Sequence, residues 1–572
     1  MIHVLLLLQG VFFCCFTFCY LLQKGKKDMI NNFVERTDFA SYEDFKEKFR
    51  LTYPKDFNFA THVVDAWAEK EPDRKALIWC DDRGHDRTFT FQEISDLSKK
   101  AARFIYTVGI RKGDRVMVQL KRRWEYWVTA VALHRIGAVL IPVSYQMSAK
   151  DIAYRINAAN IKMIISVDDP YILEQVEEAI VGCDSIHCKA LVGAARSGWL
   201  DFNANMEACP PDYIKEPTLT GTDLMLFYFT SGTTGMPKMV VHDHLHPLGH
   251  ITTAKYWQKV IDGGLHITVA DSGWAKFGWG SIYGQWICGS ALLGYDAANK
   301  FSARNLINVI RKYKPTTLCV PGTIYRFMMK EGIDREDFIS VRHCCTAGEP
   351  LAPEITRTFF DITGLTIHEG FGQSESSVMI GNFTYFDPRP GSTGKPAPLY
   401  DLCIMGEDGE DCAPGDVGEV VVRNMNTNKP EGLLRGYWKE EGLVPAWGED
   451  GIYHTGDLAW IDNDGYIWFV GRNDDMIKCS GYRIGPFEIE SVLLTHPSVL
   501  ECAITGSPDP IRGQIVKATI VLNTGFEASD ELRKELQEYV KHMTAPYKYP
   551  RIVDFVEALP KTTSGKIMRR AI

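Results

Sequence analysis

The 572-residue sequence lacks several features that would mark a specialised class of protein. No Cys-x-x-Cys pair occurs among its 15 cysteines, which argues against a zinc ribbon or a thioredoxin-like redox site. No long run of Lys or Arg is present, and 63 basic against 72 acidic residues give a net charge of −9, so nucleic acid is a poor candidate partner. Internal repeats and low-complexity tracts are also missing. Scattered cysteines in a large chain are typical of reduced, buried side chains, so we expect a reducing compartment.

The composition is that of an ordinary soluble protein. Hydrophobic residues make up 45% of the chain and charged residues 24%, which argues against disorder. At about 100–200 residues per domain, the length predicts several structural units and an ample core. These values favour a soluble enzyme or a large binding protein.

The N-terminus carries the one long apolar run, Val4–Leu22, which is followed by Lys24, Lys26 and Lys27. Its length fits a membrane-spanning helix, and the lysines would favour a cytoplasmic body. A cleaved signal peptide fits less well, because no basic residue precedes the run and no A-x-A site follows it. The run is neither Arg-rich nor Ser-rich, so it does not resemble a mitochondrial transit peptide. Residues 1–28 are therefore either an anchor or the product of a mis-set start before Met29.

Beyond about Phe57 the sequence alternates short β-branched runs with helical stretches. We expect strands at Arg115–Leu120, Ala138–Val143 and Met163–Val167, with helices at Trp124–Arg135 and Ala149–Asn157 between them. This order is the βαβ pattern, which predicts a parallel, doubly wound sheet. The same texture returns between Leu224 and about Phe383.

Near Asp387 the texture changes to Pro- and Gly-rich segments and short strands. Gly418–Arg423 reads as a strand, and Trp460–Val470 reads as a hairpin in which Asp464-Gly465 supplies the positive φ angles of a tight turn. The fold class is therefore α/β, with a large N-terminal domain of doubly wound sheets, a β-rich subdomain and a small mobile C-terminal α/β domain. The expected boundaries are a leader at 1–28, a large domain at 29–473 with its subdomain at about 387–473, and a C-terminal domain at 474–572.

The strongest motif follows an apolar strand that begins at Leu224. Its glycines let backbone N–H groups turn toward an anion, its hydroxyls add donors, and its lysine adds positive charge, which together suit a phosphate chain. The spacing is not that of a Walker A loop. The motif consists of Thr230, Ser231, Gly232, Thr233, Thr234, Gly235, Met236, Pro237 and Lys238.

Six further blocks follow in a fixed order. They are Ala347–Pro350, Glu369–Glu375, Tyr453–Asp457, Gly471–Asp475, Ser480–Arg483 and Pro560–Lys566. Together with the phosphate loop they resemble the adenylate-forming superfamily, which includes acyl-CoA synthetases, peptide-synthetase adenylation domains and beetle luciferase. The resemblance covers the chain from about residue 57 to its end and is greatest to the medium-chain acyl-CoA synthetases.

The resemblance implies an ATP site with Mg²⁺. Glu375 is a hard oxygen donor suited to Mg²⁺, and Asp457 can accept hydrogen bonds from ribose hydroxyls. Arg472 and Arg483 offer donor forks for ribose and phosphate, while Lys566 is the implied catalytic lysine that stabilises charge at the carboxylate and α-phosphate. Ser374 departs from the threonine usual in relatives but keeps the hydroxyl. The residues implied to frame the adenine and complete the ATP site are Gly348, Glu349, Pro350, Glu369, Gly370, Phe371, Gly372, Gln373 and Ser374.

The second half-reaction implied by the resemblance needs coenzyme A. The C-terminal domain is expected to swing about a hinge at Asp474 and expose a pantetheine tunnel past Gly481. The implied CoA-binding residues are Gln146, Ser480, Gly481, Tyr482, Tyr549, Pro550 and Arg551.

The acyl pocket is expected near Gly372, Trp274 and Trp279. Acetate-activating relatives carry a tryptophan at the position of Gly372, so glycine should leave the pocket open to a longer or branched acyl group. Core packing is the default reading for Trp274, Trp279 and Trp286, and the resemblance favours a pocket wall for at least one of them.

Four histidines after the phosphate loop, His242, His244, His246 and His250, alternate like metal ligands on one strand face. Carboxylate or Cys partners at suitable spacing are lacking, and the resemblance implies a strand-to-helix turn without metal there. A zinc site is therefore disfavoured.

The sequence predicts an AMP-forming acyl-CoA synthetase, an acid–thiol ligase that uses ATP, Mg²⁺ and coenzyme A. The acid stays open between medium-chain, branched short-chain and aromatic. The alternatives are an adenylation enzyme that loads a carrier protein in trans, a luciferase-like monooxygenase, and a nucleotide-binding pseudoenzyme, which the presence of Glu375, Asp457 and Lys566 disfavours. A cytoplasmic location, or a membrane anchor with a cytoplasmic body, follows from the leader, and an oligomer is possible.

Overall fold

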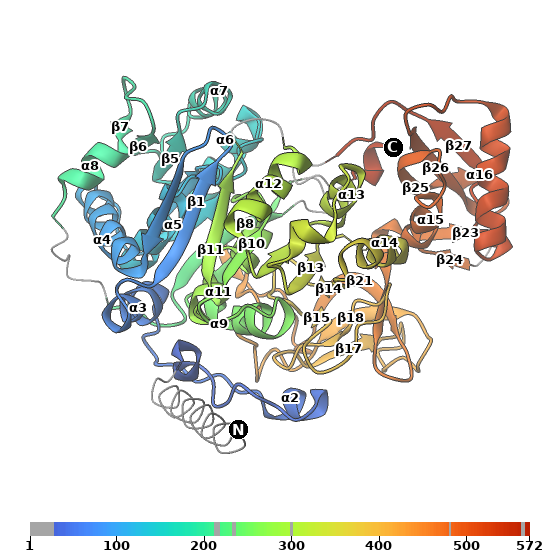
Figure 1. The fold of residues 1–572 in the computed structure, drawn as a ribbon, viewed down its shortest axis with the longest axis horizontal. Coiled ribbons are helices and arrows are strands. Elements are labelled where there is room, and N and C mark those ends of the chain that lie inside the picture. The colour runs from blue at the N-terminus through green and yellow to red at the C-terminus, as the bar shows by residue number, and fades with distance from the viewer. Residues whose placement is uncertain are drawn as a thin grey trace, which may run out of the picture.

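The computed structural model describes residues 28–210, 218–230, 236–297, 301–349, 351–479, 482–561 and 567–572. Two nine-stranded sheets lie within a large N-terminal domain, and a separate C-terminal lobe lies beside it (Figure 1). All twelve cysteines within the described residues are free. No described helix is both long and apolar enough to cross a membrane, and the leader lies outside the described residues.

The first nine-stranded sheet confirms the predicted βαβ run. Strands β3, β4 and β5 pair in parallel, with α5 and α6 between them in the chain. Burial on both faces explains these strands, since all five residues of β5 are buried. The order across the sheet is β20 (Gly442–Val444), β19 (Gly436–Lys439), β9 (Lys238–Asp243), β8 (Leu224–Thr230), β4 (Val139–Pro142), β3 (Arg115–Gln119), β5 (Met163–Val167), β6 (Cys188–Val192) and β7 (Leu200–Asp201).

The second nine-stranded sheet is parallel from β14 to β1 and antiparallel at its edges. Its carboxyl ends deliver the segments after β13 and β14, which hold the blocks expected around adenine. The order is β16 (Lys395–Pro396), β15 (Ile380–Gly381), β14 (Ile367–Phe371), β13 (His343–Ala347), β12 (Thr317–Cys319), β10 (Leu265–Thr268), β11 (Ala291–Asp296), β1 (Lys75–Asp81) and β2 (Asp86–Thr90).

Helices cover these sheets and the C-terminal lobe. Many begin at a side-chain cap, as where Thr90 and Glu93 form a reciprocal capping box at the start of α4. Their bounds are α2 (Tyr42–Lys48), α3 (Ala66–Lys70), α4 (Phe91–Thr107), α5 (Glu125–Ile136), α6 (Ala149–Ala159), α7 (Pro170–Ala179), α8 (Phe202–Ala208), α9 (His246–Ile251), α10 (Ala275–Gly280), α11 (Tyr283–Ile287), α12 (Ala303–Tyr313), α13 (Gly322–Lys330), α14 (Pro353–Thr363), α15 (Pro486–Leu493) and α16 (Asp530–Met543).

The predicted β-rich segment forms a four-stranded antiparallel sheet, β17 (Leu402–Met405), β18 (Gly418–Val422), β21 (Tyr453–Ile461) and β22 (Ile467–Arg472). The hairpin between β21 and β22 is present, but its turn differs from the prediction. Only Gly465 has a positive φ, 81°, and the turn is held instead by the Asp462 carboxylate, which accepts hydrogen bonds from the backbone of Asp464 and Tyr466. Strands β19 and β20 leave this segment and extend the first large sheet beside β9.

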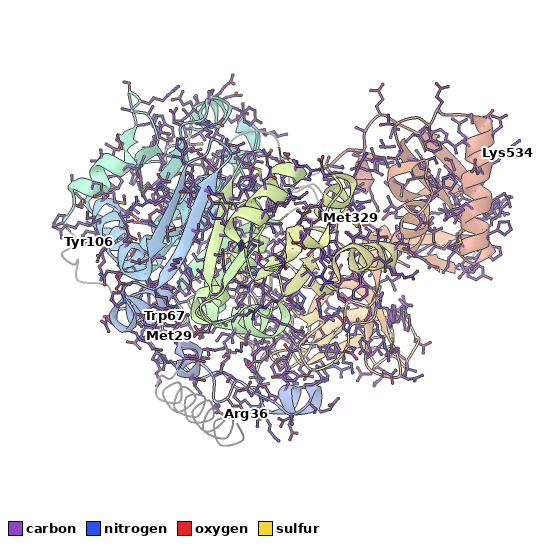
Figure 2. The ribbon with its side chains drawn as sticks, in the orientation of Figure 1. Met29, Arg36, Trp67, Tyr106, Met329 and Lys534 are labelled. Atoms are coloured by element: carbon purple, nitrogen blue, oxygen red, sulfur yellow. The ribbon has the colours of Figure 1, made fainter. Side chains whose placement is uncertain are left out.

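The C-terminal lobe has its own sheet and core. Its strands are β24 (Tyr482–Ile484), β23 (Ile477–Cys479), β26 (Gly513–Leu522), β25 (Val499–Asp509) and β27 (Ile552–Phe555). Helix α16 packs on this sheet through Leu532, Leu536 and Val540, and Figure 2 labels Lys534 on the same helix.

The segment after the leader is part of the large domain. A short 3₁₀ helix at Met29–Asn32 places Met29 at 3% exposure, and Figure 2 shows this segment against the large domain. On α2, the ring of Phe45 lies 4.4 Å from that of Tyr256, centroid to centroid, and is fully buried. Residues from Met29 onward therefore belong to the folded body.

Candidate active site

The two ends of the predicted phosphate loop lie side by side. Thr230 ends β8 and pairs directly with Lys238, which begins the antiparallel strand β9. Ser231, Gly232, Thr233, Thr234 and Gly235 lie outside the described residues. Met236 is exposed, and the carbonyl of Pro237 accepts a hydrogen bond from the Tyr154 hydroxyl.

Glu375 and Lys238 are both neighbours of Tyr437. The hydroxyl of Tyr437 on β19 donates to Glu375 Oε1 at 3.2 Å, and the Lys238 ammonium lies 5.2 Å from the centre of the Tyr437 ring. Burial raises the pKa of Glu375, while Tyr437, Lys238 and Arg472 lower it. A partly buried carboxylate beside a phosphate loop fits Mg²⁺.

Asp457 and Arg472 form a second polar group in the four-stranded sheet, just before the C-terminal lobe. They lie opposite each other on β21 and β22, and Arg472 Nη1 lies 3.4 Å from Asp457 Oδ2. Gln373 Nε2 donates to the same carboxylate and to the carbonyl of Thr455. Its side-chain oxygen in turn accepts from the Tyr453 hydroxyl at 2.8 Å. Gln373 thus joins the Glu369–Glu375 block to the Tyr453–Asp457 block.

The predicted adenine frame follows β13 and β14. Gly348 has φ +93°, a conformation that L side chains rarely adopt, and the adjacent Ala347 carbonyl accepts from the Lys276 ammonium. Glu349 Oε1 accepts from the backbone N–H of Thr323 at 2.8 Å. Pro350 lies outside the described residues.

Glu369 is the buried carboxyl of this frame. The backbone N–H of Leu351 donates to Glu369 Oε2 at 3.2 Å. Burial raises the pKa of Glu369 to about 8, so the carboxyl is protonated at neutral pH. The neighbouring Gly370 lies against the indole of Trp257, which leaves no room for a side chain there. Phe371 faces Phe469 with ring centroids 6.0 Å apart.

The surroundings of Gly372 correct the expectation of an open pocket. A Cβ atom at Gly372 would lie 2.3 Å from the Trp279 ring and 2.6 Å from the Ser377 carbonyl. The space that glycine frees is therefore filled by the Trp279 indole, delivered from α10. Trp279 also donates from its ring nitrogen to the Ser376 carbonyl at 2.9 Å.

The other two tryptophans differ from each other. Trp274 is partly buried at the N-cap of α10. Trp286 is fully buried, donates to the Ala76 carbonyl and stacks on Phe59, so it packs in the core.

The predicted CoA residues lie in two separate parts of the fold. Tyr482 is half exposed and stacks on Tyr547 with centroids 4.1 Å apart, and Pro550 is buried between Tyr549 and Arg551. Arg551 Nη1 donates to the Tyr549 hydroxyl. Gln146, in the large domain, bonds only its neighbours Ser144 and Tyr145 within the described residues. The structure thus does not join Gln146 to the C-terminal group.

The hinge candidate Asp474 lies between two arginines. Its carboxylate lies 3.8 Å from Arg472 Nε and 3.2 Å from Arg570 Nη2. Ser480, Gly481, Lys566 and the side chain of Arg483 lie outside the described residues.

The four histidines do not share one strand face; they lie at the strand-to-helix turn that the resemblance implies. Strand β9 ends at Asp243 and α9 begins at His246, so His246 and His250 are one helical turn apart. Within the described residues, no group of three His, Cys, Asp or Glu side chains is placed to hold a metal ion.

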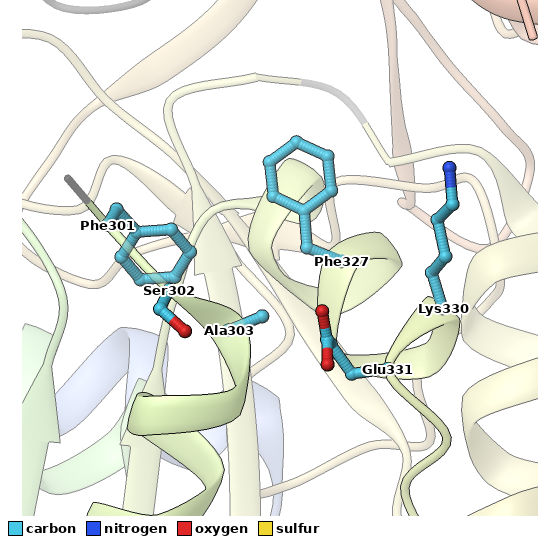
Figure 3. Close-up of a pocket in the computed structure, with 6 residues that line it drawn as sticks. All are labelled: Phe301, Ser302, Ala303, Phe327, Lys330 and Glu331. Carbon is cyan, nitrogen blue, oxygen red and sulfur yellow. The ribbon is translucent and has the colours of Figure 1, made fainter. Parts of the chain in front are cut away.

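Sequence reasoning missed Tyr437, Lys276 and Thr323, which contact predicted site residues. No motif marks them, since each reaches the site from a distant element. A surface cavity of about 510 Å³ lies elsewhere, between α12 and α13, lined by Phe301, Ser302, Ala303, Phe327, Lys330 and Glu331 (Figure 3). None of these residues belongs to the predicted site.

Comparisons with known proteins agree with this geometry. The profile of a family described as AMP-binding enzyme matches residues 64–438, and that of its C-terminal domain matches residues 488–566. The chain belongs to the AMP-binding enzyme family. The first matched range contains Glu375, and the second contains most of the C-terminal lobe.

Individual relatives support the same family. The chain is 38% identical to the mouse protein "Acyl-coenzyme A synthetase ACSM3, mitochondrial" over 94% of this chain and 93% of that protein. It is 40% identical to mouse "Acyl-coenzyme A synthetase ACSM5, mitochondrial" over 91% of each. A crystal structure of an acyl-CoA synthetase of Brucella canis is 30% identical, with a TM-score of 0.71 over 93% of this chain and 98% of that one. An anthranilate CoA ligase bound to anthranoyl-AMP superimposes with a TM-score of 0.81 at 26% identity, over 91% and 97% of the two chains.

These similarities confirm the predicted resemblance to medium-chain acyl-CoA synthetases and the α/β fold with a large and a small domain. As an AMP-binding enzyme of this group, the chain is an AMP-forming acyl-CoA synthetase, an acid–thiol ligase that takes a carboxylic acid. ATP, Mg²⁺ and coenzyme A are its cofactors.

Proposed function

We propose that the polar group around Glu375 and Asp457 joins a carboxylic acid to ATP. The acid's carboxylate oxygen attacks the α-phosphate, and the bond to pyrophosphate breaks, which leaves an acyl adenylate. The thiol sulfur of coenzyme A then attacks the acyl carbonyl, AMP leaves with the bonding electrons, and the thiol proton passes to solvent. The observation that carries this proposal is the cluster of Lys238, Tyr437, Glu375 and Gln373 beside Asp457.

Each part of the cluster suits one part of ATP. Lys238 follows the phosphate loop and lies beside the Tyr437 ring, and the Tyr437 hydroxyl donates to Glu375. The ammonium and the carboxylate are therefore both neighbours of Tyr437. Mg²⁺, when bound by Glu375, would neutralise phosphate charge. Asp457 accepts ribose hydroxyls, with Arg472 fixing its orientation from the opposite strand. Positioning and charge stabilisation of this kind supply most of the catalysis in phosphoryl chemistry.

Lys566 supplies the remaining charge in this proposal. Its loop is bounded by described residues, since Lys561 and Ile567 pair as an antiparallel bridge and Lys561 binds Glu501. Arg483 would approach the phosphate from the same lobe. These assignments rest on the family resemblance of the Pro560–Lys566 block.

The second step requires the C-terminal domain, residues 474–572, to rotate about Asp474 relative to the large domain, residues 29–473. The paired arginines on the Asp474 carboxylate, Arg472 from one side and Arg570 from the other, support a boundary at this residue. Rotation would bring Gly481 and Tyr482 toward the acyl adenylate and place Tyr549 and Arg551 near coenzyme A. Gln146 would add a contact from the large domain.

The acid is proposed to carry a compact acyl group, either short and branched or aromatic. Trp279 occupies the space above Gly372, and its indole is fixed by a hydrogen bond to Ser376. A straight medium chain would have to displace this ring. The aromatic option draws support from a structural neighbour, the anthranilate CoA ligase bound to anthranoyl-AMP.

The experiment that tests this function is pyrophosphate release over a panel of acids, with and without coenzyme A. Acid-dependent release followed by acyl-CoA formation supports the proposal. Release that transfers the acyl group only to an added carrier protein would instead show a carrier-loading enzyme. Oxygen uptake or light with any acid would show a luciferase-like reaction.

We propose a cytoplasmic body for this protein, with residues 1–28 as a candidate anchor. The relatives named above are mitochondrial by name, so a fluorescent fusion of the full chain and of a chain starting at Met29 should be compared. Mitochondrial signal from the full chain would contradict the cytoplasmic proposal, and membrane signal lost in the shorter chain would show an anchor. The oligomeric state can be measured on the same purified protein.

A further inference from the structure

The segment that carries Glu375 is held on both sides by buried side chains. His242 Nε2 lies 2.8 Å from the Ser374 carbonyl oxygen, one residue before Glu375. The Glu375 carbonyl itself accepts from the backbone N–H of Leu434 at 2.7 Å. Both carbonyls that flank the Glu375 Cα are therefore occupied, which restricts rotation of the peptide planes on either side of this residue.

His242 is the first member of a buried histidine column. Its ring lies 3.8 Å from the ring of His246, centroid to centroid. His246 Nε2 and His250 Nε2 are 3.1 Å apart, so one of the two nitrogens donates and the other accepts. His242, His246 and His250 are 0–2% exposed.

The far end of the column returns to the same segment. His250 Nδ1 lies 3.3 Å from the Thr253 hydroxyl, and that hydroxyl accepts from the backbone N–H of Val378. The column thus touches the chain at Ser374 and again at Val378, on the two sides of Glu375. The buried column is fixed to this turn at both ends of the turn. Hydrogen bonds from buried groups hold the turn more rigidly than hydrogen bonds to water would.

The proton on His242 is defined by its partner. A carbonyl oxygen can only accept, so Nε2 carries the hydrogen and donates it to Ser374. Burial lowers the pKa of His242 and His250 to about 3 in each case and lowers that of His246 well below its ordinary value, so all three rings are neutral at physiological pH. The column is a neutral hydrogen-bonding device that adds no charge to the site.

We propose that His242 is a positioning residue that orients the Glu375 carboxylate toward Mg²⁺ by donating its Nε2 hydrogen to the Ser374 carbonyl. His246, His250 and Thr253 buttress the ring and hold the other end of the turn. The inference rests on the proposed role of Glu375 as the Mg²⁺ ligand. Partners that orient a metal ligand from behind typically change metal affinity or activity by about 10- to 100-fold when removed.

The test compares His242→Leu, His242→Gln and His242→Asn in the full chain, with His244→Leu as the matched control. His244 is equally buried two residues along the chain, but within the described residues neither of its ring nitrogens has a hydrogen-bond partner. A glutamine amide can reach the position of Nε2 and donate to Ser374, whereas the shorter asparagine amide cannot. The probe is a non-hydrolysable ATP analogue titrated calorimetrically at several Mg²⁺ concentrations, together with hydrogen exchange of the Glu375–Val378 amides.

We expect His242→Leu and His242→Asn to raise the Mg²⁺ concentration needed for half-maximal analogue binding by about tenfold and to speed exchange in the turn. His242→Gln should stay within about threefold of the natural chain, and thioester formation from supplied acyl adenylate should be unchanged in all variants. If His242→Leu does not fold, the Gln and Asn pair still decides the question.

Two results would overturn the proposal. One is unchanged Mg²⁺ dependence in both His242→Leu and His242→Asn. The other is an equal loss in His244→Leu, which would show a general packing defect. Failure of every acid to release pyrophosphate in the natural chain would refute the proposed function instead, and analogue binding would still report on His242.

Discussion

The Trp279 indole lies directly on Gly372, so close that even one methyl group at Gly372 would come within 2.3 Å of the ring. From the sequence alone, the glycine predicts an empty space. In the structure, a tryptophan from another element fills that space. In the proposed acyl pocket, Trp279 from α10 fills the space beside Gly372. A Gly372→Trp variant would collide with Trp279 and the Ser377 carbonyl instead of simply shortening the pocket.

Trp279→Ala should shift acid preference toward longer chains. Removal of the indole frees space for two or three methylene groups, each worth about 0.8 kcal/mol when buried. The ratio of kcat/KM for a straight eight-carbon acid over a four-carbon acid should then rise by about 15- to 60-fold. Trp286→Phe, which alters a core tryptophan, serves as the control and should leave the ratio unchanged. An unchanged ratio in Trp279→Ala would remove Trp279 from the pocket wall.

Glu369 should give the folding stability a pH dependence. Its pKa is about 8 in the folded chain and near 4.5 when exposed. Between these values the folded state holds a proton that the unfolded state has released, so the free energy of unfolding falls as pH rises through this window. The slope contributed by one group is at most about 1.4 kcal/mol per pH unit.

Urea unfolding at about pH 5 and about pH 8 measures this effect. Glu369→Gln should abolish the corresponding part of the fall, because the amide cannot ionise. Glu349→Gln, at an exposed carboxylate that bonds Thr323, should keep it. Equal pH dependence in the natural chain and in Glu369→Gln would contradict a protonated Glu369.

Truncation should separate the leader from the folded body. A chain that starts at Met29 loses only the backbone hydrogen bond from Asn31 to Asp28 among the described contacts, so its thermal midpoint and activity should equal those of the full chain. Phe45→Ala in that chain should destabilise it by about 3–5 kcal/mol, because Phe45 is fully buried against Phe39, Tyr256 and Tyr385. Loss of activity on removal of residues 1–28 alone would show that the leader takes part in the fold or the reaction.

Gly481→Leu should separate the two half-reactions. If the pantetheine arm passes Gly481 only after domain rotation, the leucine should block acyl-CoA formation by about 100-fold or more and leave acid-dependent pyrophosphate release intact. Lys478→Leu, at an exposed position three residues earlier, is the control. Blocked pyrophosphate release with normal use of coenzyme A would show that this loop has another role.

Local patterns predicted the elements whose signals are local. The run β3–α5–β4–α6–β5 follows from short β-branched segments alternating with helical stretches, and its predicted bounds agree with the structure to within one or two residues. The amphipathic pattern predicted for Trp124–Arg135 was wrong, because every residue of α5 is buried. The phosphate loop and the Glu369–Glu375 block were likewise found as ordered motifs, and Gln373 does connect that block to Asp457.

Contacts between distant elements could not be read from the sequence. The alternation of His242, His244 and His246 suggested one strand face, but the chain turns into a helix after Asp243, which changes the period from two to nearly four residues. The packing of Trp279 against Gly372 and the hydrogen bond from Tyr437 to Glu375 depend on how whole elements pack. No local residue pattern predicts such long-range contacts.

The central claim is that acid activation and thioester formation are separate steps, with Lys566 serving only the first. The direct measurement is acid-dependent ATP–pyrophosphate exchange without coenzyme A, beside thioester formation from supplied acyl adenylate, in the natural chain and in Lys566→Ala. We predict exchange in the natural chain, a loss of about 10²- to 10³-fold in the variant, and thioester formation unchanged. Exchange that requires coenzyme A, or an equal loss in both half-reactions, would contradict the account.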